Sequence, residues 1–262
     1  MKRLAEVKFQ RLLFVRGVTH LLMGVLRWQL FAGLKGAWSR FGLGVILVSF
    51  LASCASTGGW HQRLTVTVMT PEGPVSGESV MGVEFRDPPD SLAAIDNFTT
   101  DGYGEAVVVD LGDGRYLFAL LHGSPDGLAG QLREAYRDIY DAHRASGFGR
   151  YIRKVKADGT ARVLPEHAYP MLVAFEDLSV PESVVEVPPD DLESVFGAGF
   201  SIESMTLEIT WDPITTGRVV SVLPWLPKLN RAFTNVEGAA MISASSPPID
   251  FVSRRDFIRK KP

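Results

Sequence analysis

The only cysteine of the chain, Cys54, stands at the end of an apolar run that divides the chain into two parts. The run covers residues 41–52 (FGLGVILVSFLA) and follows two basic residues, Lys35 and Arg40. Twelve apolar residues suit the hydrophobic region of a signal peptide, whereas a membrane-spanning helix needs about 20. The sequence therefore predicts that residues 1–53 are a leader, and that only the chain after them folds into a body.

The distribution of charge agrees with this division. Residues 1–53 hold eight basic and one acidic side chain of the 27 and 30 in the whole chain, which leaves 19 and 29 for residues 54–262. A basic, apolar leader before an acidic body is typical of an exported protein. An acidic body also argues against a nucleic-acid partner, which requires a basic surface. A single cysteine allows no disulfide within the chain, so stability must come from an ordinary core.

The residues at the end of the apolar run resemble a bacterial lipobox. Leu51, Ala52 and Ser53 precede Cys54, and the lipobox likewise places a branched apolar residue and two small residues before its cysteine. The resemblance implies that Cys54 is diacylglycerated, that the leader is cut before it, and that the new amine is acylated. Two or three acyl chains anchor a protein stably, whereas a single chain is marginal.

Two alternatives stay open for this segment: Cys54 is a buried core cysteine, or it is incidental and follows an uncleaved single-pass anchor. The leader is longer than the roughly 15–30 residues that are usual, which makes Met23 a candidate for the true start. Residues 54–60 begin with small side chains and are predicted to form a flexible tether between the lipid and the body.

The first half of the body has the alternation of apolar residues that strands require. Residues 63–70 (RLTVTVMT) and 78–85 (ESVMGVEF) are predicted strands, and residues 105–111 and 115–121 flank a GDG turn as a predicted hairpin. Residues 87–104 are predicted to form a loop. The turns in TPEGPVSGESV and TTDGYGEAVVVDLGDGRYLFAL resemble those of transthyretin-like and other seven-stranded sandwich modules of secreted proteins, which implies a β-sandwich.

The second half mixes helices and strands. Apolar residues recur on one face of residues 126–147, with Asp126 as a candidate cap and Gly147 as a stop, and they predict one long amphipathic helix. A basic hairpin around Asp158-Gly159, a buried strand over 169–177, a short helix in PPDDLESVFG and a strand over 201–210 follow.

The body contains no repeat or long linker that would divide it. Residues 61–262 are therefore predicted to be one α+β domain, β-rich, with a sandwich-like N-terminal half and the long amphipathic helix. Residues 170–226 also resemble uncharacterised proteobacterial proteins that share the patterns P-x-LV-x-F-x-D, P-x-SV, P-D-x-L…FG-x-G and T-x-E-I-T. That resemblance implies no activity.

The histidines of the body give little support to a catalytic or metal site. These histidines are His61, His122, His143 and His167. None of them has the spacing of a zinc ligand set. Asp141 and His143 lie two residues apart on a helix and so face different directions. His122 and Ser124 follow a strand but lack the G-x-S-x-G elbow of a hydrolase nucleophile.

Three further groups are candidates with simpler explanations. The acidic clusters can act as acid–base pairs or calcium ligands, but helix caps and turns explain them as well; they are Glu176-Asp177, Asp190-Asp191-Glu193 and Asp110 with Asp113. Trp60, Trp211 and Trp225 are candidates for a carbohydrate surface or for the core. The basic tail, Arg254-Arg255 and Arg259 to Lys261, is a candidate for contact with anionic lipid or peptidoglycan, or a solvated terminus.

These features predict a lipid-anchored cell-envelope protein that faces the periplasm as a binding or structural module. Lipidation is expected at Cys54, and Ala55 after it favours the outer membrane. The expected partners are the membrane, through the anchor, and an envelope protein or the cell wall. No catalytic residue, cofactor or metal ligand is assigned. The alternatives are an envelope hydrolase, favoured if a pocket joins His122 or His143 to an acid, and a single-pass membrane protein without lipid.

Overall fold

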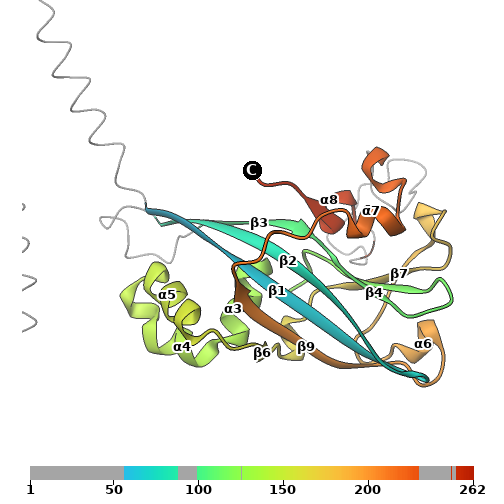
Figure 1. Cartoon of the computed structure of the whole chain (residues 1–262), viewed down its shortest axis with the longest axis horizontal. Coiled ribbons are helices and arrows are strands. Elements are labelled where there is room, and N and C mark those ends of the chain that lie inside the picture. The colour runs from blue at the N-terminus through green and yellow to red at the C-terminus, as the bar shows by residue number, and fades with distance from the viewer. Residues whose placement is uncertain (1–55, 88–98, 125, 230–248, 250–251) are drawn as a thin grey trace, which may run out of the picture. The chain divides into compact units, whose positions relative to one another are not determined.

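The computed structural model of the chain describes residues 56–87, 99–124, 126–229, 249 and 252–262 (Figure 1). All of them belong to one unit of the chain, residues 55–262. The predicted leader, its cleavage box and Cys54 lie outside the described residues. The fold is β-rich α+β, with two antiparallel sheets and several short helices. This confirms the predicted fold class at its coarser level.

The larger sheet has six strands in the order β10-β3-β2-β1-β9-β6. Its centre is a long hairpin of β1 (Ser56–Thr70) and β2 (Gly73–Asp87), and β9 (Ser201–Thr210) pairs with the other edge of β1, so that the three strands run side by side in Figure 1. Leu64, Val66 and Val68 of β1 are buried and alternate with half-buried neighbours, as their period of two predicts.

Short strands complete this sheet at both edges. β3 (Thr99–Glu105) pairs with β2, and β10 (Ile258–Arg259) pairs with β3, so the end of the chain closes one edge. β6 (Arg162–Val163) pairs with β9 at the other edge. The loop predicted for 87–104 is therefore wrong at Asp87, the last residue of β2, and over residues 99–104, whereas residues 88–98 lie outside the described residues. The glycines of residues 99–104 suggest a turn, but Gly102 is a strand residue whose Cβ would lie 2.8 Å from the Leu128 side chain.

The smaller sheet has four strands in the order β4-β5-β7-β8. They are β4 (Val107–Asp110), β5 (Tyr116–Ala119), β7 (Leu172–Phe175) and β8 (Val184–Glu186). β4 and β5 form the predicted hairpin, whose turn places Gly112, Asp113 and Gly114 at positive φ. Both sheets contain strands from both halves of the body, so the sheets are not confined to the predicted N-terminal half.

Hydrophobic side chains cover both faces of the smaller sheet. Val107, Val109 and Leu117 belong to a large cluster that also contains Leu64 and Val66 of the larger sheet. The intervening residues, among them Val108 and Phe118, belong to a second cluster with Leu223, Leu226 and Phe257 from the C-terminal segments. A strand buried on both faces has a continuous apolar sequence, which is why VVV and LFALL show no alternation.

The helix predicted over 126–147 is divided in the structure. α3 (Gly127–Ala135) and α4 (Arg137–His143) are separated at Tyr136, whose φ of −115° and ψ of 40° leave the helical range. The Tyr136 side chain is fully buried, and its hydroxyl donates to the Thr160 carbonyl at 2.5 Å. Packing of this one side chain between distant segments explains the break, which helical periodicity does not reveal. Asp126 occupies the cap position of α3 without a side-chain cap bond.

The hairpin predicted around Asp158-Gly159 is also wrong, because α5 (Phe148–Asp158) occupies this segment. Its buried residues have the spacing of one helix face, and they are Phe148, Tyr151, Ile152 and Val155. Gly159, at φ 64°, ends the helix as a left-handed cap. The Asp-Gly pair therefore marks a helix end rather than a hairpin turn. α6 (Glu193–Phe196) is the short helix that was predicted in PPDDLESVFG.

The range predicted as a tether, residues 54–60, is structured from Ser56 onward. Residues 56–60 pair with β2, and Trp60 lies opposite Val83 with only 3% of its surface exposed. Its ring contacts Phe85 and Phe148, with centroids 6.1 and 5.9 Å away. The strand β1 therefore begins two residues after Cys54 in the sequence.

None of the helices in the described ranges is long and apolar enough to cross a membrane.

Candidate functional site

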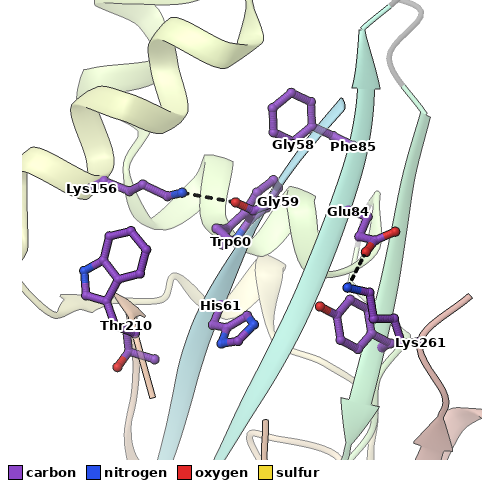
Figure 2. A pocket seen from close by; sticks show the side chains of 11 residues that line it. Gly58, Gly59, Trp60, His61, Glu84, Phe85, Lys156, Thr210 and Lys261 are labelled. Carbon is purple, nitrogen blue, oxygen red and sulfur yellow. Dashed lines mark hydrogen bonds and ion pairs between the residues drawn. The ribbon is translucent and has the colours of Figure 1, made fainter. Parts of the chain in front are cut away.

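A pocket of about 560 Å³ opens beside the first residues of β1 (Figure 2). β1 contributes residues 58–61, and the other walls come from β2, β3, α5, the end of β9 and the C-terminal segment. We call this cavity the β1 pocket. Its lining is Gly58, Gly59, Trp60, His61, Glu84, Phe85, Tyr103, Lys156, Thr210, Trp211 and Lys261.

Glycines in the strands make room for the aromatic rings of the β1 pocket. Gly58 pairs with Phe85, and a Cβ on Gly58 would lie 2.6 Å from the Phe85 ring. Gly82 pairs with Tyr103 in the same way, and its Cβ would lie 2.2 Å from that ring. Each ring thus lies over the bare backbone of the neighbouring strand, a close approach that only glycine permits.

Two lysine side chains supply the positive charge of the pocket. Lys156 Nζ donates to the Gly59 carbonyl at 3.1 Å and lies 5.3 Å from the centroid of the Trp211 ring. Lys261 Nζ lies 2.9 Å from Glu84 Oε1 (Figure 2) and 5.7 Å from the centroid of Tyr103. Burial lowers the pKa of Lys156, whereas the Glu84 carboxylate raises the pKa of Lys261.

The two ammonium groups therefore differ in how readily they can bind an anionic ligand. The charge of Lys261 is offset by a carboxylate. Among the described residues, Lys156 Nζ contacts a carbonyl and an aromatic ring and forms no ion pair, so its charge can attract an anionic group. The pocket combines this cation with aromatic walls.

The three candidate tryptophans do not form one surface. Trp60 is a core residue that lines the inner wall of the β1 pocket, and Trp211 stands at the same pocket with 85% of its surface exposed. Trp225 packs in the second cluster, where its Nε1 donates to the Leu178 carbonyl at 2.6 Å. The structure brings together two of the three.

His122 lies beside an acidic residue, which is one part of what the hydrolase alternative requires. Its Nδ1 lies 3.3 Å from Asp256 Oδ1. However, Asp256 Oδ2 accepts from the backbone N and the Oγ of Ser253, and so caps α8 (Arg254–Phe257). Ser124 Oγ donates to the Gly127 carbonyl at 3.2 Å, and His122 does not line the β1 pocket. The pair connects α8 to the segment that follows β5.

The other histidines lie apart from one another. His61 Nδ1 lies 2.7 Å from the Asp212 carbonyl, and His167 Nε2 lies 3.2 Å from Glu134 Oε2. In the described part of the chain, Asp141 and His143 on α4 form no ion pair with each other. Among the described residues, no group of three or more histidine, cysteine, aspartate or glutamate side chains is placed to hold a metal ion.

The acidic clusters bind nearby backbone groups. Asp177 Oδ1 accepts from the N and Oγ of Ser179, which lowers its pKa. Asp191 accepts from the backbone N of Ser194 at 3.2 Å, which is the predicted helix cap. Asp110 accepts from Gly112 in the hairpin turn, and Glu193 accepts from Gly199. These contacts favour turn and cap roles.

The basic tail lines a second cavity of about 990 Å³, together with Glu105 of β3 and residues near α7 (Arg218–Val222). We call it the C-terminal cavity. Four of its lining residues are basic: Arg254, Arg255, Arg259 and Lys260. The tail is therefore part of the folded body rather than a free terminus.

Sequence reasoning missed the residues that complete the β1 pocket. Tyr103 and Lys156 lie in segments predicted to be a loop and a hairpin. The one local indication of the pocket in the sequence is Gly58-Gly59 before Trp60, because adjacent glycines in a strand indicate close packing against the backbone.

No family model, curated protein or solved structure matches the chain. The resemblances to lipoprotein precursors, to transthyretin-like modules and to the uncharacterised proteobacterial proteins stay predictions.

Proposed function

We propose that the chain is a lipid-anchored cell-envelope protein, which is acylated on Cys54 and cleaved between Ser53 and Cys54. In this proposal residues 55–262 act as a binding module on the periplasmic side, and Ala55 directs the protein to the outer membrane. The apolar run, its basic flank and the residue types from Leu51 to Cys54 support the anchor. The observation on which the binding role depends is the start of β1 at Ser56, two residues after the proposed acylation site.

In this proposal, the short stretch of chain between Cys54 and β1 would keep the β1 pocket near the lipid. Gly58 is four residues from Cys54, and an extended chain spans at most about 3.6 Å per residue, so the two lie within roughly 15 Å. Trp211 follows Thr210, which pairs with His61 of β1. An exposed tryptophan and a lysine beside the anchor suit the interface of a bilayer, where such side chains keep a polar end in water.

The β1 pocket is the candidate ligand site of this module. Aromatic walls bind apolar or sugar rings, and the Lys156 ammonium attracts an anionic group. The acyl chains would hold this pocket at one membrane face and raise its effective concentration there. The expected ligand is therefore a component of the envelope with a ring and an anionic group.

Intact mass spectrometry of the full chain from the membrane fraction of a Gram-negative host tests the proposal, with Cys54→Ala as control. We expect a mature chain that begins at Cys54 and has the mass of two or three acyl groups, and an unprocessed chain for the variant. An unmodified chain that retains residues before Cys54 would overturn the lipid anchor and leave a single-pass membrane protein.

An envelope hydrolase is the second candidate, and the His122–Asp256 pair is the observation that favours it. Labelling with a fluorophosphonate probe, which reacts with activated serines, separates the two candidates. A binding module is expected to show no labelling. Labelling of Ser124 that disappears in His122→Ala would establish a hydrolase instead.

A further inference from the structure

We propose that the C-terminal cavity binds a phosphate-bearing ligand. The proposal goes beyond the envelope function above and does not depend on acylation of Cys54. It rests on the charge of the cavity, on the partners of its basic side chains and on the elements that hold them in place.

The cavity is positively charged within an acidic body. Its charged lining residues are Glu105, Arg254, Arg255, Arg259 and Lys260, which is one carboxylate against four cations. Its volume of about 990 Å³ is within the range that small-molecule sites occupy. An anion would therefore find both room and compensating charge.

The cations of the cavity differ from Arg63 and Lys261 in their partners. Arg63 forms ion pairs with Glu78, Glu208 and Asp212, and Lys261 pairs with Glu84. In contrast, Arg255, Arg259 and Lys260 form no ion pair in the part of the chain that the structure describes. The guanidinium of Arg254 donates to the Pro227 carbonyl at 3.1 Å and faces no carboxylate there.

The one carboxylate of the cavity is already bound to the backbone. Glu105 is only 5% exposed, and its two oxygens accept from Gly217 N at 2.6 Å and from Val219 N at 3.1 Å. Both bonds hold its charge at the start of α7, where backbone N–H groups stabilise an anion. Glu105 is therefore not a partner for the cations across the cavity.

Secondary structure holds the arginines in place. Arg254 and Arg255 lie on α8, which has a capping box of Ser253 and Asp256. Arg259 lies on β10, opposite Gly104 of β3. The backbone bond from Ala106 N to the Phe257 carbonyl, 2.8 Å long, fixes the link between these two elements. The guanidinium groups are thus attached to an ordered backbone, which reduces the entropy lost on binding.

Phosphate is the anion that suits this arrangement. A guanidinium presents parallel N–H donors that match two phosphate oxygens, and phosphate has enough oxygens and charge for several such groups. Two sources have this chemistry: a soluble phosphate compound, and the headgroup of an anionic phospholipid.

The test uses the full chain with Cys54→Ala, purified in an uncharged detergent, so that it is independent of lipidation. Pyrophosphate binding is measured by calorimetry. Binding to nanodiscs of phosphatidylglycerol is compared with binding to nanodiscs of phosphatidylcholine. The variant is Arg255→Gln with Arg259→Gln. The control is Arg150→Gln with Arg153→Gln, which removes the same charge from exposed positions on α5.

We expect the cavity variant to weaken binding about tenfold or more, as the loss of charge-assisted bonds implies, and the control to change it less than about twofold. Selective loss of pyrophosphate binding supports a soluble ligand, and selective loss only with phosphatidylglycerol supports a headgroup. Equal losses in both variants, or no binding of either probe, would overturn the proposal. Equal melting temperatures of the two variants show that a selective loss is not due to unfolding.

Discussion

Single residues decide how closely the two sheets approach each other. Gly77 of β2 faces the smaller sheet, and a Cβ at this position would lie 2.2 Å from the Val108 carbonyl oxygen. The neighbouring atom belongs to backbone, so it cannot move aside as a flexible side chain would. The glycine in PVSG, which from the sequence suggests a turn, is thus a strand residue that permits contact between sheets.

Gly77→Ala is therefore expected to destabilise the protein. We predict a loss of about 2–3 kcal/mol in the free energy of unfolding, since the added methyl group must displace backbone. Urea unfolding at pH 7 measures it. Ser76→Ala, at the exposed neighbouring position, is the control and is expected to change stability by less than about 0.5 kcal/mol. Equal effects of both substitutions would contradict the close approach.

The buried hydroxyl of Tyr136 predicts a loss of stability at alkaline pH. Burial raises the pKa of Tyr136 to about 12, whereas tyrosine in an unfolded chain titrates near about 10. Between these values the unfolded state loses a proton that the folded state keeps, so stability falls as the pH rises, by at most about 1.4 kcal/mol per pH unit.

Urea unfolding at pH 8, 10 and 11.5 tests this with two variants. Tyr136→Phe lowers stability at pH 8, because it loses the bond to Thr160, but is expected to show a shallower decline above pH 10. The decline persists in part, because burial also raises the pKa of Tyr151. Tyr140→Phe, at a half-buried position on α4, is expected to keep the wild-type slope. Identical slopes in all three proteins would contradict the assignment.

At the scale of elements, the sequence predicts those strands and turns that depend only on neighbouring residues. The alternation in β1 and β9 and the Gly-Asp-Gly turn between β4 and β5 are local features, and these strands are confirmed. The break at Tyr136 depends on a contact with Thr160 and Leu207, which no local window contains. β3 shows the same limit, because its glycines are explained by packing against α3 and β2.

Glu105 connects β3 to the start of α7, and its removal is expected to lower the free energy of unfolding strongly. Glu105→Ala leaves the N–H groups of Gly217 and Val219 without the bonds they make at the start of α7. We predict a loss of about 3 kcal/mol, because bonds to a charged group contribute about 1.5–3 kcal/mol each. Glu84→Ala, which removes the exposed ion pair with Lys261, is expected to lose much less, because solvent screens such a pair. Urea unfolding of both distinguishes them, and equal losses would argue against the capping role.

At the scale of the whole molecule, the smaller sheet is a wall shared by two hydrophobic clusters. Leu117 belongs to the first cluster and Leu223 to the second, and both are fully buried. Because β4 and β5 contribute to both clusters, neither can lose its packing while the other stays intact. The described body is therefore expected to unfold as one cooperative unit.

Leu117→Ala and Leu223→Ala test this cooperativity. Each is predicted to lower the free energy of unfolding by about 2–5 kcal/mol and to keep a single transition. Circular dichroism and tryptophan fluorescence followed through the same urea series should give coincident curves. Val163→Ala, at a position 67% exposed, is the control for the loss of methyl groups. A separate early transition in Leu223→Ala would show that the second cluster unfolds independently.

The candidate sites were predictable only in part for a related reason. The sequence indicates Trp60, Trp211 and the basic tail as candidates, because tryptophans and clusters of charge can be recognised without knowing the fold. It does not show that Tyr103 and Lys156 reach the same pocket, since only the pairing of distant strands and the position of α5 bring them there. The contact between His122 and Asp256 likewise depends on where α8 lies.

The C-terminal strand β10 lines the C-terminal cavity, and the residues that follow it line both cavities. Its neighbour Lys260 lines the C-terminal cavity, whereas the next residue, Lys261, lines the β1 pocket. A ligand that held this strand at one cavity is expected to restrict the lysine at the other. Thermodynamic linkage then requires reciprocity: the factor by which occupancy of one cavity changes affinity at the other is the same in both directions. The last residues of the chain would thus couple the two binding equilibria.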